Sequence, residues 1–287
     1  MADFDNDPLV GTDWLAEHLS APDVRVVDGS YYLPHEGLDP RAEYEAHHIP
    51  GAVFFDIDEI ADTDSPLPHM LPAPEKFSSR VRKLGLGDGV RIVVYDQRGL
   101  FSAPRVWWTF RFFGHEHVAV LDGGLPKWQS EGRPLEDGPV RPVERRFTAR
   151  VNGLMARDRA QMLANVAGGR EQVLDARSRG RFEGADPEPR PGLRAGHIPG
   201  SRNLPFTDLI DPARQTMLPP EEMKQRFAEA GLDMTRPVVT TCGSGITAAV
   251  LALGLQLVGH RDVGLYDGSW AEWGEPDDTP VETGPAR

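Results

Sequence analysis

The sequence repeats itself once, and this repeat constrains the fold more than any other feature. In each half an apolar strand ends at an aspartate, a polar helix precedes a His-Ile-Pro-Gly turn, and a later strand leads into the pattern Asp-Gly-x-x-x-x-Trp. Matching points lie 145 to 149 residues apart in the 287-residue chain: Asp28 and Asp175, His48 and His197, Asp96 and Cys242, and Trp128 and Trp273. Four anchors with nearly constant spacing indicate a duplicated domain.

The boundary between the two copies is expected in the stretch 132–153, which is rich in proline, glycine and charged residues. We predict a first domain over residues 1–140, a linker over 141–153 and a second domain over 154–287.

Short apolar segments alternate with helical patterns through both copies. Strands are expected at 24–27, 52–55, 92–95, 118–121, 173–174, 238–241 and 263–266. Thr12 is expected to cap the first helix, and Pro74, Pro104 and Pro220 are placed to open later ones. The alternation predicts an α/β fold, with each domain a mostly parallel sheet covered by helices on both faces. The two His-Ile-Pro-Gly turns occupy the same place in both copies, so we expect them to be structural.

The stretch 238–259 contains the only cysteine and reads as strand, loop and helix. Cys242 is first in the loop, and Gly243 and Gly245 let the backbone turn tightly. Successive N–H groups and the first turn of the helix can then point at one spot, which stabilises a thiolate. A lone cysteine more often simply packs in a core, but packing alone does not require Gly-Ser-Gly after it.

The loop separates three families that use a cysteine in such a setting. Phosphatases with a C-x5-R loop need an arginine where this chain has Ala248. Thiosulfate sulfurtransferases of the rhodanese type typically follow the cysteine with two cations, whereas here Gly243 and Ser244 are neutral. The run CGSGIT resembles the loop of 3-mercaptopyruvate sulfurtransferases, with Ile246 a mild departure. The resemblance covers nearly the whole chain and implies two tandem rhodanese-like domains, the first one catalytically silent because Asp96 replaces the cysteine.

The resemblance also implies a set of site residues. Cys242 would be the nucleophile, and Arg181 and Arg190 would hold the substrate carboxylate, a task suited to guanidinium groups. Ser244, together with Asp58 and His69, matches the proton relay of the family. Thr247 would hold the loop, and Gly243, Gly245 and Ile246 complete it.

Two alternatives remain open for these assignments. Asp58 and His69 could belong to a solvated acidic loop. Arg181 and Arg190 could form surface ion pairs with the nearby acidic residues Glu183, Asp186 and Glu188.

Composition excludes several classes of partner. The formal charge of −13 argues against nucleic acid and anionic membrane, which both need basic patches. One cysteine rules out an intramolecular disulfide and a multi-cysteine zinc site. We expect no metal or other cofactor, because the acidic cluster at 56–64 lacks the glycine and distal glutamate of an EF-hand, and His115 and His117 have no evident third ligand. Without an apolar span or a signal-peptide pattern, the protein is expected to be cytoplasmic.

The sequence therefore predicts a 3-mercaptopyruvate sulfurtransferase that acts through a Cys242 persulfide. The acceptor is expected to be a thiol such as thioredoxin or glutathione, or cyanide. One alternative is a thiosulfate sulfurtransferase of the same fold, and another is an idle rhodanese-like module that binds partners or senses oxidants through Cys242.

Overall fold

The computed structural model describes residues 7–275 and 277–286, which form two compact units. The first unit contains the residues up to Thr63, Leu71–Asn152 and Asp211–Met217. The second contains Asp64–Met70, Gly153–Ile210 and the residues from Leu218 onward. Each half of the chain thus contributes one seven-residue segment to the other half's unit. The two exchanged segments are 147 residues apart and occupy the same place in the repeat.

The first unit is built on a five-stranded parallel sheet with the order β1-β5-β4-β2-β3. Its strands are β1 (Leu9–Val10), β2 (Val24–Asp28), β3 (Val53–Phe54), β4 (Arg91–Tyr95) and β5 (Val118–Leu121). The second unit repeats this order as β6-β10-β9-β7-β8. Its strands are β6 (Ala156–Arg157), β7 (Gln172–Asp175), β8 (Arg202–Asn203), β9 (Val238–Thr241) and β10 (Val263–Tyr266). All seven predicted strands are confirmed; the two-residue strands β1, β6 and β8 were not predicted.

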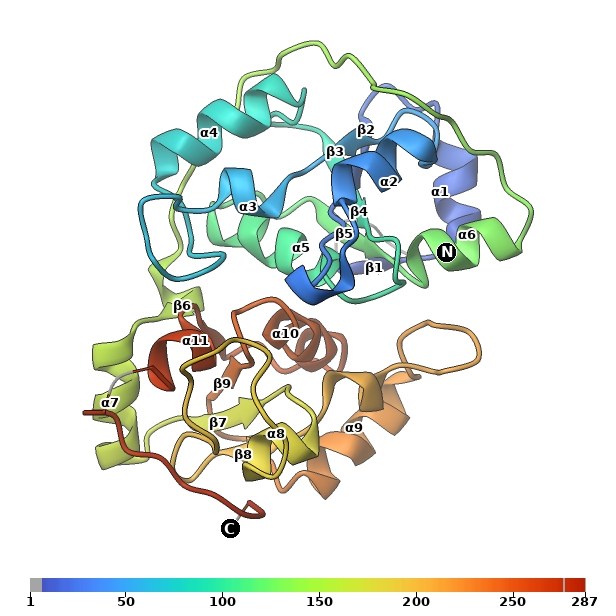
Figure 1. Ribbon diagram of the computed structural model, residues 1–287. Helices are drawn as coiled ribbons and strands as arrows, with labels where there is room; N and C mark the ends of the chain where they lie inside the picture. Colours follow the sequence, from blue (N-terminus) through green and yellow to red (C-terminus); the bar gives the residue numbers. More distant parts are fainter. Residues whose placement is uncertain (1–6, 276, 287) are drawn as a thin grey trace. The chain divides into compact units, whose positions relative to one another are not determined.

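Helices cover both faces of the first sheet (Figure 1). They are α1 (Thr12–His18), α2 (Pro40–Ala46), α3 (Ile57–Ile60), α4 (Pro74–Lys83), α5 (Ala103–Phe112) and α6 (Gly124–Ser130), with a 3-10 turn at Pro34–Glu36. One core joins Leu15 of α1, Tyr44 of α2 and Trp128 of α6 to the sheet residues Val93 and Tyr95. On the opposite face α5 contacts β4 and β5. The predicted architecture is confirmed.

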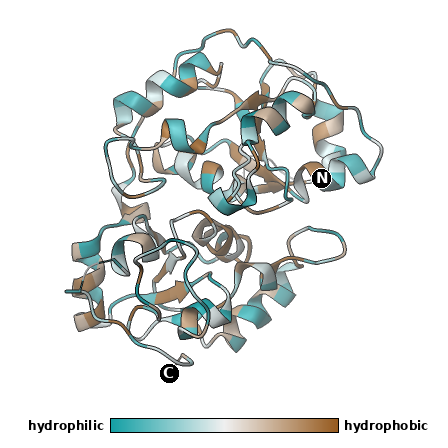
Figure 2. Cartoon of the chain, in the orientation of Figure 1, coloured by the Kyte–Doolittle hydropathy of each residue, from teal (hydrophilic) through white to brown (hydrophobic). Residues whose placement is uncertain are grey.

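The second unit carries α7 (Arg159–Gly168), α8 (Arg179–Glu183), α9 (Pro220–Glu229), α10 (Ala248–Leu257) and α11 (Ser269–Trp273), with 3-10 turns at Gly153–Met155 and Phe206–Leu209. Its core joins Met162 of α7 and Trp273 of α11 to Val173, Val239 and Tyr266 of the sheet. Figure 2 shows apolar colours on the strands and polar residues on α9. By contrast α10 is buried along residues 248–255, as expected for a helix that is apolar on all sides.

One predicted helix start is wrong. Thr12 does not cap α1, because the cap position is Gly11 and Thr12 is the first helical residue. The Thr12 hydroxyl instead accepts a hydrogen bond from Lys127 Nζ at 2.7 Å, which ties α1 to α6.

The His-Ile-Pro-Gly turns have equivalent contacts in the two units. The ring of His48 stacks on Tyr44 and its Nδ1 lies 2.9 Å from the Tyr44 carbonyl oxygen. The ring of His197 stacks on Phe182 and its Nδ1 lies 2.8 Å from the Phe182 carbonyl oxygen. Both histidines are buried, and each forms a backbone bridge, His48 to Glu136 and His197 to Glu282. Their role in the fold is therefore structural, as predicted.

The stretch expected to form a linker lies along the first unit. Phe147 is buried against Phe77 and Phe110, and the backbone of Arg150 donates a hydrogen bond to Phe113. Among residues 7–275 and 277–286, no helix is long and apolar enough to cross a membrane.

Candidate active site

Cys242 follows directly after β9, at the carboxyl end of the sheet in the second unit, and is 2 % exposed. Its N–H donates a hydrogen bond to Ser269 Oγ at 3.3 Å. Its carbonyl accepts one from the N–H of Trp270, and the carbonyl of Gly243 accepts one from the N–H of Ala271. Because C=O and the following N–H point in opposite directions in a trans peptide, the N–H groups of Gly243 and Ser244 point away from α11.

The first unit shows what this type of loop binds. Asp96, the counterpart of Cys242, accepts four backbone hydrogen bonds of 2.8 Å with its buried carboxylate, from the N–H groups of Arg98, Phe101, Ser102 and Ala103. The Asp96 carbonyl also accepts from Leu125, as that of Cys242 does from Trp270. An anion on the first side chain of the loop is therefore held by the N–H groups that follow it. In the second unit Cys242 occupies this first position of the loop.

The two loop glycines are present for different reasons. Gly245 has a φ of +79°, in the left-handed region that favours glycine. Gly243 does not lie in that region, so the turn does not require it. A Cβ atom on Gly243 would instead lie 3.0 Å from Nη2 of Arg181. The prediction that both glycines serve the turn is correct for Gly245 only, because Gly243 makes room for an arginine.

Arg181, in α8, belongs to a chain of four charged side chains. Its Nη2 and Nε lie 2.6 and 3.3 Å from the two carboxylate oxygens of Glu188. Nη1 of Arg177 lies 2.7 Å from Glu188 Oε1, and Arg177 pairs with Asp175 at 2.6 Å. Arg181 thus does form the ion pair considered as an alternative. The pair is not a solvated one, because the Glu188 side chain is only 3 % exposed while that of Arg181 keeps 24 %.

Arg190 lies beside His69 in the second unit. Nη2 of Arg190 is 3.4 Å from Nε2 of His69, which belongs to the segment Asp64–Met70 contributed by the first half of the chain. His69 is 5 % exposed, so it is not part of a solvated loop. Asp58 is an exposed residue of α3 in the first unit.

The remaining predicted residues line the loop itself. Ser244 and Ile246 are both buried. Thr247 is the cap residue of α10, although its side chain makes no capping hydrogen bond. The structure therefore groups Cys242 and its loop with Arg181, and Arg190 with His69. The described residues contain no cluster of three or more side chains suited to holding a metal ion.

Sequence analysis missed Ser269, which contacts the Cys242 backbone. This residue is fully buried and has a φ of +49°, a left-handed conformation that is uncommon for non-glycine residues. Its hydroxyl accepts from Cys242 N–H and donates to the carbonyl of Tyr266 at 2.8 Å. The repeat contains the signal, because the matching position in the first copy is Gly124, with a φ of +51°.

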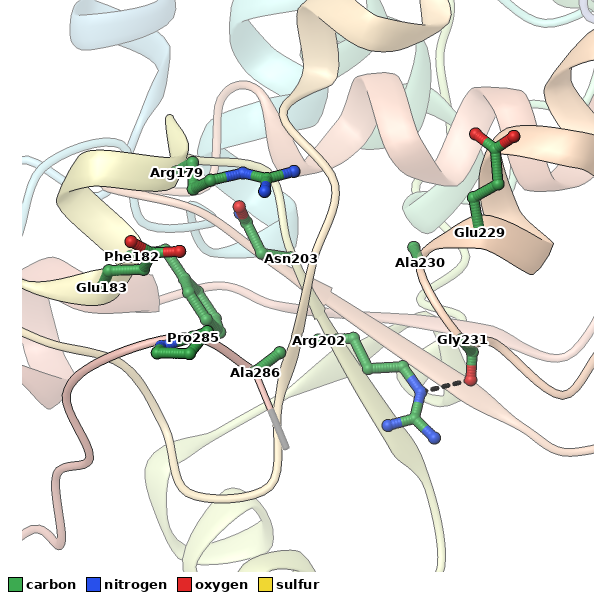
Figure 3. Close-up of a pocket in the computed structure, with 10 residues that line it drawn as sticks. All are labelled: Arg179, Phe182, Glu183, Arg202, Asn203, Glu229, Ala230, Gly231, Pro285 and Ala286. Carbon is green, nitrogen blue, oxygen red and sulfur yellow. Dashed lines mark hydrogen bonds between the residues drawn. The ribbon is translucent and has the colours of Figure 1, made fainter.

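A separate cavity of about 390 Å³ lies near the edge strand β8 (Figure 3). It is lined by Arg179, Phe182, Glu183, Arg202, Asn203, Glu229, Ala230, Gly231, Pro285 and Ala286. Neither Cys242 nor Arg181 is among these residues, so this cavity is not the site assembled around the cysteine.

Known proteins were compared with this chain by family, by sequence and by structure, and all three comparisons find rhodanese-like or sulfurtransferase proteins. The model of the rhodanese-like domain matches residues 11–131 and 158–276. Human 3-mercaptopyruvate sulfurtransferase is 46% identical over 271 residues, covering 92% of this chain and 91% of the relative. Mouse thiosulfate sulfurtransferase is 43% identical over 274 residues, covering 92% and 91%. The crystal structure of a 3-mercaptopyruvate sulfotransferase from Escherichia coli superposes with a TM-score of 0.85 at 40% identity, covering 92% of this chain and 99% of the other.

Proposed function

Because this chain belongs to the family of rhodanese-like sulfurtransferases, we propose that it is a 3-mercaptopyruvate sulfurtransferase acting through a persulfide on Cys242. Overall similarity does not separate this activity from thiosulfate sulfur transfer, since relatives of both names are more than 40% identical. The observation that supports mercaptopyruvate is the loop. Gly243 and Ser244 bring no cation to the sulfur, while Arg181 borders the loop as a receptor for a carboxylate.

The first half-reaction moves one sulfur atom to the protein. The Cys242 thiolate attacks the sulfur of 3-mercaptopyruvate, a sulfur–sulfur bond forms, and the carbon–sulfur bond breaks. The electron pair of the broken bond leaves on carbon as the enolate of pyruvate, which takes up a proton. The proton released from the substrate thiol balances the one that pyruvate acquires.

Each proposed residue has a role in this step. Arg181 and Arg190 hold the carboxylate of the donor, and the N–H groups of the loop stabilise charge at the sulfur. Ser244, Asp58 and His69 form the proposed proton relay. Its support is the family resemblance and the position of His69 beside Arg190.

The second half-reaction returns Cys242 to its starting state. A thiolate acceptor attacks the outer sulfur, takes it as a new persulfide and releases the Cys242 thiolate; cyanide would leave as thiocyanate. We propose a small thiol or a thiol protein such as glutathione or thioredoxin as acceptor. A reducing compartment such as the cytoplasm suits the single free cysteine.

One experiment compares the two donors. The protein is given 3-mercaptopyruvate or thiosulfate separately, and pyruvate, sulfite and the mass of the protein are measured. Release of pyruvate with a mass gain of one sulfur atom supports the proposal, whereas sulfite alone would favour thiosulfate sulfur transfer. In Cys242→Ser we expect neither product, because a hydroxyl group there is neither ionised nor sulfur-philic; turnover by that variant would rule out the persulfide.

A further inference from the structure

The carboxylate of Glu188 accepts hydrogen bonds from one edge of the Arg181 guanidinium. A guanidinium offers two edges to a carboxylate, one formed by Nε and Nη2 and the other by Nη1 and Nη2. Glu188 binds the first, with its two oxygens at 3.3 Å from Nε and 2.6 Å from Nη2. The second edge remains for another carboxylate. Nη2, which both edges share, is the atom that a Cβ on Gly243 would approach to 3.0 Å, so this corner of the guanidinium lies next to the Cys242 loop.

Glu188 is itself fixed in place from the other side. Its Oε1 also accepts from Nη1 of Arg177, whose side chain is fully buried. Arg177 is held by Asp175 and by the carbonyl of Gly196, and its guanidinium stacks 4.3 Å from the ring centre of Trp270. The buried network therefore fixes the position of Glu188. Glu188 in turn fixes the orientation of the Arg181 guanidinium through its two hydrogen bonds.

The charge of Glu188 works against anion binding. Asp175 with Arg177, and Glu188 with Arg181, form two neutral pairs, so Glu188 cancels the charge that Arg181 would offer to a donor. Retaining an acid in this place makes sense if it orients the arginine. Orientation matters for a planar carboxylate that needs two parallel hydrogen bonds, and little for a donor that is attracted by charge alone.

We propose that Glu188 is a positioning residue for donor recognition. It holds Arg181 by one edge so that the other edge receives the carboxylate of the sulfur donor beside Cys242. This inference rests on the proposed function, because it concerns a donor that carries a carboxylate.

The test uses Glu188→Gln, with Glu183→Gln as the matched control. Glu183 loses the same charge in the same segment but is not part of the network around Arg177 and Arg181. For 3-mercaptopyruvate we expect kcat/KM of Glu188→Gln to fall about tenfold, mainly through KM. For thiosulfate we expect kcat/KM to stay level or rise, because Arg181 is no longer neutralised. The control should match the wild type with both donors, and a variant that is merely damaged would lose activity with both donors alike.

A double-mutant cycle with Arg181→Ala tests the route of the effect. If Glu188 acts through Arg181, adding Glu188→Gln to Arg181→Ala should leave KM for 3-mercaptopyruvate unchanged. Fully additive losses, or equal losses with both donors, would overturn the proposal.

Pyruvate binding separates this inference from the proposed function. The dissociation constant of pyruvate is measured by calorimetry on the same proteins, and it reports carboxylate binding without turnover. Absence of mercaptopyruvate turnover in the wild type would contradict the proposed function. A pyruvate affinity that Glu188→Gln leaves unchanged would contradict the role of Glu188.

Discussion

At the scale of single residues, the chain places different side chains at the first position of two loops that follow the equivalent strands β4 and β9. Asp96 supplies a buried carboxyl group that accepts hydrogen bonds from the N–H groups of the first loop, and Cys242 supplies a sulfur at the same position of the second. A carboxylate cannot accept and pass on sulfur. We therefore expect sulfur transfer at the loop of Cys242 and not at the loop of Asp96, because the side chains at this first position differ.

The arginines can be tested by their effect on donor choice. Arg181→Ala and Arg190→Ala each remove a charge-assisted contact to the proposed carboxylate, which should lower kcat/KM for 3-mercaptopyruvate roughly ten- to hundredfold. Thiosulfate has no carboxylate and should be affected less. Steady-state kinetics with both donors checks this expectation, and equal losses would show that the arginines do not form a carboxylate clamp.

Ser269 can be tested by its effect on stability. Ser269→Ala keeps the left-handed backbone and removes the hydroxyl that binds Cys242 N–H and the Tyr266 carbonyl, which should cost about 1–3 kcal/mol of unfolding free energy. Ser269→Gly loses the same hydrogen bonds but relieves about 1 kcal/mol of backbone strain. Urea unfolding should therefore rank the wild type above Ser269→Gly and that variant above Ser269→Ala; the reverse order of the two variants would show that the backbone there is not strained.

At the scale of elements, the equivalent strands β7 and β2 both end at an aspartate, but only the aspartate of β7 has an arginine partner two residues later. β7 ends at Asp175, which pairs with Arg177, while β2 ends at Asp28, and the position matching Arg177 is Ser30. Asp28 is fully buried, and burial raises its pKa from 3.8 to about 6. The end of β2 thus carries a carboxyl group that favours its neutral form.

This difference predicts a pH-dependent effect of Asp28→Asn. Because the pKa of Asp28 is higher in the folded than in the unfolded state, the carboxyl group stays protonated to a higher pH when the protein is folded. The unfolding free energy therefore falls as the pH rises from about 4 to about 6. Asp28→Asn should have little effect near pH 4 and add up to about 3 kcal/mol near pH 7. Urea unfolding at both pH values checks this, and a destabilised variant at pH 7 would contradict the assignment. Burial also raises the pKa of Asp122 to about 6. The unfolding free energy of Asp28→Asn should therefore still fall between pH 4 and pH 6, because Asp122 remains in the variant.

Sequence patterns predicted elements best where the signal is local. The runs 118–121, 238–241 and 263–266 match β5, β9 and β10 to the residue, because apolar or β-branched residues fill most of them and polar residues or turns bound them. The edge strands β1, β6 and β8 have two residues each, too few to show a period. The equally short β3 was predicted because it lies in the apolar run 52–55. The contact of Ser269 with Cys242 joins residues 27 positions apart, so no local pattern could reveal it. Glu188 lies close in sequence to Arg177 and Arg181, but the irregular segment between them shows no period from which their contacts could be predicted.

At the scale of the whole molecule, each compact unit contains residues from both halves of the chain because of the exchanged segments Asp64–Met70 and Asp211–Met217. In the first unit the N–H of Met217 donates to Asp122 Oδ1 at 2.8 Å, and a Cβ on Gly99 would meet Gln215 at 3.3 Å. The second unit contains Asp64–Met70, whose His69 lies beside Arg190. Neither unit consists of one continuous stretch of sequence.

Native-state hydrogen exchange can test this exchange of segments. Amides open together with the structure that protects them, so increasing denaturant should expose the amide of Met217 in step with β5 of the first unit. We expect α9, its near neighbour in sequence, to follow β9 of the second unit. Exchange of Met217 in step with α9 would contradict the assignment of residues 211–217 to the first unit.

The exchanged segments also set the order in which this protein can be completed during synthesis. A tandem protein made from the N-terminus can normally finish its first domain while the second is still being translated. Here the first unit lacks Asp211–Met217 until about half of the second copy has been made. Although its sequence comes first, the first unit reaches its final form only when much of the second unit has also left the ribosome.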